Sequence, residues 1–271
     1  MSEGGPLPVA VLGATGRMGR LVIAEVLDAP DLVLVAALAS PGGVAVGADA
    51  GTLAGRAACG VNVTRPGPDA FADARIVIDF SLPDALAATL PHLGDRALVT
   101  GTTGLSPELT ALRDAHAERG PLLAAANFSL GVHLLMDLVR RAASALPHAD
   151  LEIVETHHRK KIDAPSGTAL ALADAAQAGR AEPLERRFGR SGRTGARASS
   201  EIGVHALRGG DVVGEHTVWF LDDGERVSLT HAASSRVTFA RGAVRAARWI
   251  GHRPAGRYDM AQVLGLSNQI G

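Results

Sequence analysis

A glycine-spaced loop near the start of the chain constrains its fold more than any other feature. Val9–Leu12 is a continuous apolar run, and residues 13–19 that follow it read GATGRMG. Apolar residues then recur with helical spacing over residues 18–26, and Leu32–Leu38 is a second apolar run. This order is typical of a strand–loop–helix–strand unit in a parallel sheet that is buried on both faces.

The loop also has the chemistry of an anion site. Gly13, Gly16 and Gly19 follow the spacing G-x-x-G-x-x-G, a variant of the commoner G-x-G-x-x-G. Backbone N–H groups at a helix start, together with the helix dipole, attract phosphate groups. The alternative is a turn with purely structural glycines, which the strand and helix on either side make weaker. We therefore predict that the unit binds the pyrophosphate of a nicotinamide dinucleotide.

Strands and helices continue to alternate through the first half of the chain. We expect strands at Ile76–Phe80, Ala97–Thr100 and Leu122–Ala126, and helices at Pro83–His92 and Ser106–Glu118. Each expected helix has a proline in or near its first turn, where the missing N–H has no cost. Such alternation predicts an α/β fold with a Rossmann-like, doubly wound parallel sheet.

The pattern changes after about residue 128, where strands begin to follow one another without helices between them. The expected elements are helices at Leu130–Leu146, Ser166–Ala178 and Arg236–Ile250, strands at Leu151–His158, Ile202–Leu207, Val213–Leu221 and Arg226–His231, and an exposed, mobile loop at Glu182–Ser200. Residues 222–224, Asp-Asp-Gly, predict a hairpin between the last two strands. We expect an inserted α+β domain with a mixed or antiparallel sheet.

Composition excludes several classes of partner. A net charge of −1 provides no field to attract nucleic acid or a membrane surface. No apolar run approaches the ~18 residues that a membrane span needs. Cys59 is the only cysteine, which excludes an internal disulfide framework and fits a reducing compartment. We expect a cytoplasmic protein, and we predict no metal site.

Two later loops follow expected strands at their carboxyl ends, where ligands bind in this architecture. Residues 101–104 read GTTG and residues 125–129 read AANFS. Their small hydroxyl and amide side chains suit a nicotinamide ribose and carboxamide, although each loop alone is also compatible with an ordinary turn. After the second apolar run, residues 37–42 read ALASPG and contain no acidic ligand for an adenosine ribose.

The segment from residue 155 to residue 168, ETHHRKKIDAPSGT, is the most informative part of the chain. Residues 157–161 carry five cationic or potentially cationic side chains. The helix start after them offers an anion the N–H groups of Gly167 and Thr168 and the Thr168 hydroxyl. A solvated basic loop and simple N-capping by Ser166 are the alternatives. The combination predicts a small carboxylate substrate, and histidine suits proton transfer near neutral pH.

Taken together, these motifs resemble the 4-hydroxy-tetrahydrodipicolinate reductase (dihydrodipicolinate reductase) family of bacterial lysine biosynthesis. The similarity rests on GATGRMG, Asp79-Phe80, GTTG, AANFS and above all HHRKKIDAPSGTAL, and it continues through residues 203–205, 213–216 and 231–236. It implies NAD(P)H-dependent reduction of a cyclic dicarboxylate to tetrahydrodipicolinate, with loss of water, in the diaminopimelate route. It also implies a dinucleotide-binding domain at 1–129 and 240–271, and a substrate-binding, homotetramer-forming domain at 130–239.

The resemblance also implies roles for individual residues. His157 and Lys161 are expected to be the catalytic pair. The expected substrate-binding residues are His158, Ser166, Gly167, Thr168 and Arg236. The expected cofactor-binding residues are Gly13, Ala14, Thr15, Gly16, Arg17, Met18, Phe80, Gly101, Thr102, Thr103, Ala125, Ala126, Asn127 and Phe128.

The chain departs from the family pattern at the adenosine end of the cofactor site. Ala39 and Ser40 stand where well-known members carry an acidic residue followed by Arg, and Leu82 stands where some carry a second Arg. Those cations favour a 2′-phosphate, so we expect no strong preference for NADPH and favour NADH. Arg17, inside the glycine loop, is a candidate phosphate contact.

Two other functions remain open from the sequence. A related two-domain NAD(P)-dependent dehydrogenase of an amino-acid pathway would normally use a cysteine or a differently placed lysine, and Cys59 lies away from the expected strand ends. A non-catalytic dinucleotide-binding sensor would be expected to lose His157 or Lys161, and both are present.

Overall fold

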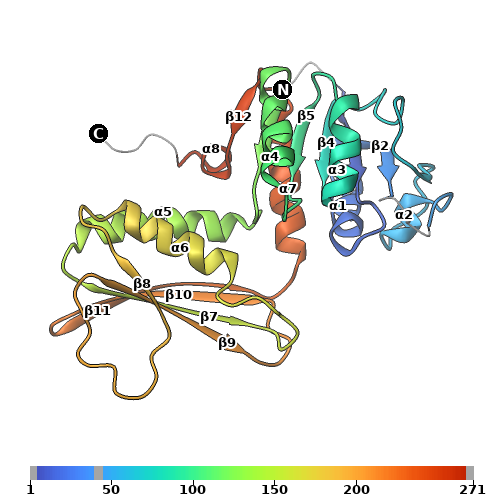
Figure 1. Ribbon diagram of the computed structural model, residues 1–271. Helices are drawn as coiled ribbons and strands as arrows, with labels where there is room; N and C mark the ends of the chain where they lie inside the picture. Colours follow the sequence, from blue (N-terminus) through green and yellow to red (C-terminus); the bar gives the residue numbers. More distant parts are fainter. Residues whose placement is uncertain (1–4, 40–44, 267–271) are drawn as a thin grey trace. The chain divides into compact units, whose positions relative to one another are not determined.

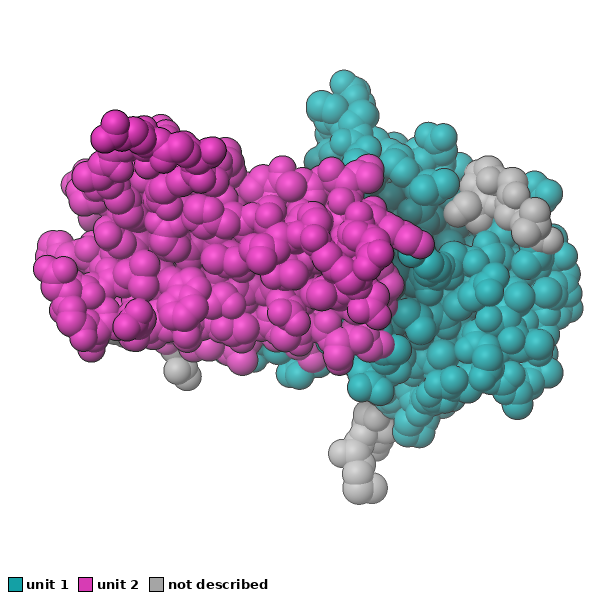
Figure 2. All heavy atoms as spheres, turned by 90° about the horizontal axis from the view of Figure 1, so that it is seen from below, with its two compact units in different colours: residues 1–129, 237–271 teal, residues 130–236 magenta. Residues whose placement is uncertain are grey.

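The chain forms two compact units, which are described separately below. The computed structural model describes residues 5–39 and 45–266. The first unit comprises residues 1–129 and 237–271, and the second comprises residues 130–236 (Figure 2). The chain therefore enters the second unit once and returns from it once. The return lies at residue 237, whereas the sequence placed it near residue 240.

The first unit is built on a seven-stranded sheet in the order β12-β6-β5-β4-β1-β2-β3, in which every neighbouring pair is parallel. The strands are β1 (Leu7–Leu12), β2 (Leu32–Leu38), β3 (Val63–Thr64), β4 (Ile76–Asp79), β5 (Ala97–Thr100), β6 (Pro121–Ala124) and β12 (Gly256–Tyr258). All residues of β4 and β5 are buried, because helices cover both faces of the sheet. The predicted doubly wound α/β fold is confirmed.

Helices form the outer layers of this unit (Figure 1). They are α1 (Arg17–Leu27), α2 (Ala50–Leu53), α3 (Pro83–Thr89) with the short 3-10 turn η1 (Leu90–His92), α4 (Pro107–Asp114) with η2 (Ala115–Glu118), α7 (Val237–Ile250) and α8 (Met260–Leu264). Helices α1 and α7 pack against each other, while α3, η1 and α4 contribute leucines to the core on the other face. Among the described residues, no helix combines the length and apolar character needed to cross a membrane.

The second unit has a five-stranded sheet in the order β11-β10-β7-β9-β8. Its elements are α5 (Leu130–Ala145), β7 (Asp150–His157), α6 (Gly167–Ala178), β8 (Glu185–Phe188), β9 (Glu201–Arg208), β10 (Gly214–Asp222) and β11 (Glu225–Ala233). The sheet is mixed, because β7 runs parallel to β9 but antiparallel to β10. Helices α5 and α6 cover one face (Figure 1). The predicted hairpin joins β10 to β11, with Gly224 at a φ of +86°.

The prediction of an exposed, mobile loop over Glu182–Ser200 is wrong in one respect. Residues Glu185–Phe188 form β8, an edge strand that pairs with β9 through its backbone. All four of its side chains are exposed, so the segment shows neither alternation nor an apolar run. The sequence analysis also did not propose α2, β3, β12 and α8, which are five residues long or shorter.

The packing of α1 on β1 requires glycine at position 19. A Cβ on Gly19 would overlap the carbonyl oxygen of Gly13 and lie 2.9 Å from the Ala14 Cα. We expect Gly19→Ala to destabilise the protein by about 1–3 kcal/mol, as overpacking does in other cores. Thermal unfolding measures this, and Gly67→Ala is the matched control because a Cβ on Gly67 meets nothing within 4 Å. Equal unfolding midpoints for the two variants would contradict the prediction.

Candidate active site

The glycine loop leads from β1 into α1. Gly13 has a φ of +80°, and a Cβ there would also overlap the backbone of Phe80 at the end of β4. Gly16 is the N-cap residue of α1, and no side chain caps the first-turn N–H groups. The helix start therefore presents those donors and its positive dipole to an anion. Of the other predicted residues of the loop, Ala14 is buried, Thr15 is half-buried and Arg17 is exposed.

A cavity of about 270 Å³ in the first unit collects residues from the ends of several strands. The rings of Phe80 and Phe128 form part of its wall, with centroids 5.4 Å apart in an edge-to-face arrangement. Gly101 passes so close to Phe80 that a Cβ would overlap the ring. The cavity brings together seven predicted cofactor-binding residues, which are Met18, Phe80, Gly101, Thr103, Ala126, Asn127 and Phe128.

A buried carboxylate organises the loops beside this cavity. Asp79, the last residue of β4, accepts hydrogen bonds from the hydroxyls of Thr100 at 2.6 Å and Thr102 at 2.8 Å, and from the N–H of Ser81 at 2.9 Å. Burial raises the pKa of Asp79 despite these bonds. Thr102 and Ala125 line a further cavity of about 280 Å³. The bonds of Asp79 thus hold the strand ends where the predicted cofactor residues lie.

In the second unit, the predicted catalytic histidine ends β7. His157 Nδ1 lies 2.5 Å from Glu155 Oε2. Glu155 is completely buried and also accepts the N–H of Ser166 at 2.9 Å and two hydrogen bonds of 2.8 Å from Arg208. Burial alone would raise the pKa of Glu155, but the hydrogen bonds from Arg208, His157 and Ser166 outweigh it and hold that pKa below its usual value.

Ser166 links this cluster to the start of α6. Its Oγ accepts the N–H of Ala169 as an N-cap and lies 3.0 Å from His216 Nε2. The rings of His216 and His157 meet edge to face, with centroids 5.1 Å apart. Burial, followed by the charge of His157, lowers the pKa of His216 to about 4, so this ring is neutral at pH 7. Ser166 is therefore a helix cap as well as a candidate substrate contact.

The loop between β7 and α6 carries the predicted lysine. Lys161 Nζ donates to both carboxylate oxygens of Asp163 at 2.8 Å. His158 donates its backbone N–H to Val212 O, and its Nδ1 is buried without a hydrogen-bond partner among the described residues. A ligand carboxylate can compete with Asp163 for Lys161, because the Asp163 side chain is 57% exposed and its pair with Lys161 is screened by water.

The remaining predicted substrate residues differ in how closely they join this cluster. Gly167 is the first residue of α6, and a Cβ on it would meet nothing within 4 Å, so the space beside it is open. Thr168 follows it in the first turn of the helix. Arg236 is half-buried at the end of the second unit, after β11, and the contacts described above do not include it. The contacts given above for the described residues therefore join His157, Ser166 and the α6 start, and they do not include Arg236.

The match to known proteins covers nearly the whole chain. Residues 7–128 match the family model "Dihydrodipicolinate reductase, N-terminus", and residues 131–264 match "Dihydrodipicolinate reductase, C-terminus". The 4-hydroxy-tetrahydrodipicolinate reductase of Alkalilimnicola ehrlichii is 49% identical over 263 residues, which cover 95% of this chain and 98% of that relative. The chain belongs to the dihydrodipicolinate reductase family. The reductase of the same name from Chromohalobacter salexigens is 46% identical over 265 residues, with the same coverage.

The fold is also that of a solved dihydrodipicolinate reductase. The dipicolinate-bound enzyme from Paenisporosarcina sp. TG-14 superposes with a TM-score of 0.72 over 95% of this chain and 98% of that one. Its sequence identity is 22%, so this comparison supports the shared architecture. The family models and the sequence relatives confirm the family resemblance identified from the sequence, and the solved structure confirms the fold.

Several residues of the candidate site were not singled out by the sequence analysis. Phe239, from α7, completes the aromatic cavity of this dihydrodipicolinate reductase family member. Asp79 was noted only as part of a motif, although an acidic residue at the end of the apolar strand Ile76–Asp79 was a usable signal. Glu155 lies two residues before His157, but its partner Arg208 is 53 residues away in sequence. Only the pairing of β7 with β9 brings Arg208 to it.

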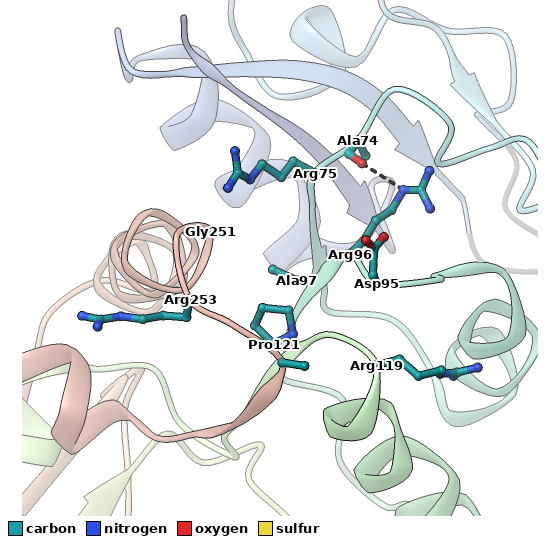
Figure 3. A pocket seen from close by; sticks show the side chains of 10 residues that line it. Ala74, Arg75, Asp95, Arg96, Ala97, Arg119, Pro121, Gly251 and Arg253 are labelled. Carbon is teal, nitrogen blue, oxygen red and sulfur yellow. Dashed lines mark hydrogen bonds between the residues drawn. The ribbon is translucent and has the colours of Figure 1, made fainter. Parts of the chain in front are cut away.

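A basic cavity of about 490 Å³ lies where β4, β5 and β6 begin, at the opposite edge of the sheet from the glycine loop (Figure 3). Its arginines do not converge on a ligand. Arg96 donates to four backbone carbonyls, and the guanidinium of Arg253 lies 4.1 Å from the ring centroid of Trp249. Arg75 and Arg119 point in different directions in Figure 3. This cavity is thus a structural feature rather than a second anion site.

Proposed function

We propose that the protein catalyses the NAD(P)H-dependent reduction of 4-hydroxy-tetrahydrodipicolinate to tetrahydrodipicolinate in the diaminopimelate route of lysine biosynthesis. The observation that carries the proposal is the second-unit cluster, in which Glu155 links a histidine to a helix start with open space beside it, while a lysine lies in the loop that leads into that helix. Membership of the dihydrodipicolinate reductase family supplies the reaction. We also propose that the protein acts in the cytoplasm, where a lone thiol such as that of Cys59 stays reduced.

The overall reaction balances as substrate plus NAD(P)H plus one proton, giving tetrahydrodipicolinate, NAD(P)⁺ and water. The substrate's carboxylates are bound by the N–H groups of Gly167 and Thr168 at the start of α6, and by the side chains of His158 and Lys161. The side chain of Ser166 is committed to capping the helix and to the contact with His216. Its part in binding is therefore to keep the donors of α6 in place.

The 4-hydroxy substrate first loses water, which leaves a C=C bond conjugated with the imine, and a bound nicotinamide cofactor would supply a hydride to the far carbon of that bond. The electron pair displaced by that addition needs a proton on the neighbouring ring carbon. His157 has its Nδ1 side tied to Glu155, which leaves Nε2 as the nitrogen that can donate a proton. Lys161 neutralises a carboxylate as negative charge builds up on the substrate. It is also the alternative proton donor.

The residues of the first unit fit a nicotinamide dinucleotide. The uncapped start of α1 and the close glycine backbone suit the pyrophosphate, and the aromatic cavity at the strand ends suits the nicotinamide ring. GenD2 from gentamicin A biosynthesis, solved in complex with NAD, shares this fold with a TM-score of 0.57 and 16% identity, covering 100% of this chain and 90% of that one.

Lys161 tests the proposed reaction. We expect Lys161→Ala to lower turnover by about 100-fold or more, as the loss of acid–base and charge-stabilising groups does elsewhere, and to leave NADH affinity unchanged. NADH consumption is followed at 340 nm with the substrate generated by the preceding synthase. Lys160→Ala is the matched control, because Lys160 is exposed and has no assigned role.

Three outcomes would contradict the proposal at different points. Near-normal turnover by Lys161→Ala would remove Lys161 from the mechanism. Tight NADH binding without substrate-dependent consumption by the wild-type protein would indicate a sensor. Consumption with an amino-acid semialdehyde instead of this substrate would indicate a related dehydrogenase.

We infer that the enzyme has no strong preference for NADPH and favours NADH. Ala39 directly follows β2 and is buried, and Leu82 is the N-cap residue of α3 and is 62% exposed. Neither side chain offers a cation to a 2′-phosphate. Ser40, the other position in this argument, lies outside the described residues. Comparison of kcat/KM with the two cofactors tests this inference. A preference for NADPH of more than tenfold would contradict it.

We propose that the second unit assembles a homotetramer through its sheet. One face of the sheet is covered by α5 and α6, whereas the other carries apolar side chains, including half-buried Trp219 and the 50% exposed Leu207. Apolar side chains exposed on a sheet face that no helix covers favour association. Sedimentation velocity should give four chains, and Trp219→Glu should shift the distribution toward smaller species. A monomeric wild-type protein at micromolar concentration would contradict the assembly.

A further inference from the structure

A single carboxylate in the second unit contacts three separate parts of the candidate site. Glu155 lies on the helix-covered face of β7, with an exposed fraction of 0%. It bonds to His157 on its own strand, to the N–H of Ser166 at the start of α6, and to Arg208 at the end of β9. A fully buried carboxylate is retained only when such partners satisfy it, because burial of an uncompensated charge is costly.

The ionisation of Glu155 determines which nitrogen of His157 carries a hydrogen. The fork of Arg208 donates to both oxygens of Glu155 at 2.8 Å, a geometry that requires a carboxylate. A carboxylate only accepts hydrogen bonds, so Nδ1 of His157 must donate. Nε2 is then the position at which a proton is gained or given. A Cβ on Gly214 would lie 2.9 Å from Nε2, so glycine there leaves room for this edge of the ring.

We propose that Glu155, held by Arg208, is a positioning residue that fixes the orientation and tautomer of His157 and stabilises its protonated form. This inference rests on the proposed function, in which His157 donates a proton to the substrate. Nothing in the sequence motif alone distinguishes Glu155 from Glu152, which also lies on β7 and is paired with arginines and a histidine. Glu155 differs from Glu152 because it is fully buried and contacts His157.

Arg208 connects Glu155 to the loop that carries Lys161. Its guanidinium donates to the backbone carbonyl of Asp163 at 2.7 Å while it holds Glu155. The side chain of Asp163 in turn accepts from Lys161. One buried carboxylate therefore keeps the proton donor, the carboxylate-binding helix start and the lysine loop in register. Misplacement of any of these by about 1 Å would reduce catalysis strongly.

The charged and titratable groups around His157 come from four parts of this unit. His216 on β10 is neutral at pH 7, and His231 on β11 has its pKa lowered by burial. Arg208 on β9 is bound to Glu155, and Lys161 in the loop after β7 is bound to Asp163. Glu155 is the carboxylate in direct contact with the imidazole. Its removal should therefore destabilise the protonated ring.

The test compares Glu155→Gln with the wild-type enzyme over a range of pH. We expect kcat to fall by about 100-fold, within the range for general acid catalysis and for residues that orient a reactive group. The alkaline limb of the kcat/KM profile should move to lower pH, because the ring loses the carboxylate that contacts it. NADH affinity should stay unchanged, since Glu155 lies in the second unit.

Two variants serve as controls. Glu155→Asp keeps the charge and should restore most of the alkaline limb, while Glu152→Gln makes the same substitution on the same strand and should leave kcat and the limb unchanged. A fall in kcat without movement of the limb would mean a merely structural role and would overturn the proposal. Wild-type kcat in Glu155→Gln would overturn it as well.

A measurement on the unmodified protein covers the case in which Glu155→Gln does not fold. Neutron diffraction of the wild-type protein should show hydrogen on Nδ1 of His157 and none on Glu155. Hydrogen on Nε2 with a bare Nδ1 would overturn the proposal. If the wild-type protein instead failed to consume NADH with substrate, the proposed function would fail, while the neutron result would still decide the Glu155–His157 contact.

Discussion

Two carboxylates without access to solvent, one in each unit, set the arrangement of the binding loops. Asp79 ends β4 in the parallel sheet, and Glu155 lies near the end of β7 in the mixed sheet. Neither can rely on water, so each must be satisfied by protein donors, and those donors belong to loops and helix starts that carry the predicted site residues. The need to solvate two buried acids with protein groups thus becomes a constraint on site geometry.

The two buried carboxylates are stabilised by different kinds of hydrogen-bond donor. Asp79 is surrounded by hydroxyls and an N–H, its hydrogen-bond partners within residues 5–39 and 45–266 include no cation, and burial raises its pKa. Glu155 has an arginine fork and a histidine, which hold its pKa below the usual value. A neutral set of donors suits a unit that accepts an anionic cofactor at its helix start. A charged set suits the proposed role of this unit, in which a histidine holds and releases a proton.

Much of the fold follows from local patterns. Apolar runs of buried strands and the glycine loop predict the parallel sheet, and the change of pattern after residue 128 predicts an inserted second domain. These patterns do not predict edge strands such as β8. Its side chains are all exposed, and it pairs with β9 through its backbone. Short elements such as β12, three residues long, carry too few side chains for a period to be visible.

The catalytic candidates His157 and Lys161 could be proposed from the sequence because the HHRKKIDAPSGTAL segment, which concentrates cations next to a helix start, resembles the motif of the family. Their supporting groups could not, because the contact of Arg208 with Glu155 spans 53 residues and depends on strand register. The same holds for Phe239, which reaches the aromatic cavity only because α7 returns to the first unit. The sequence by itself thus indicated the fold class and, through the resemblance, the candidate reactive groups. Tertiary packing decided which buried partners contact them, because burial and long-range pairing are properties of the folded chain alone.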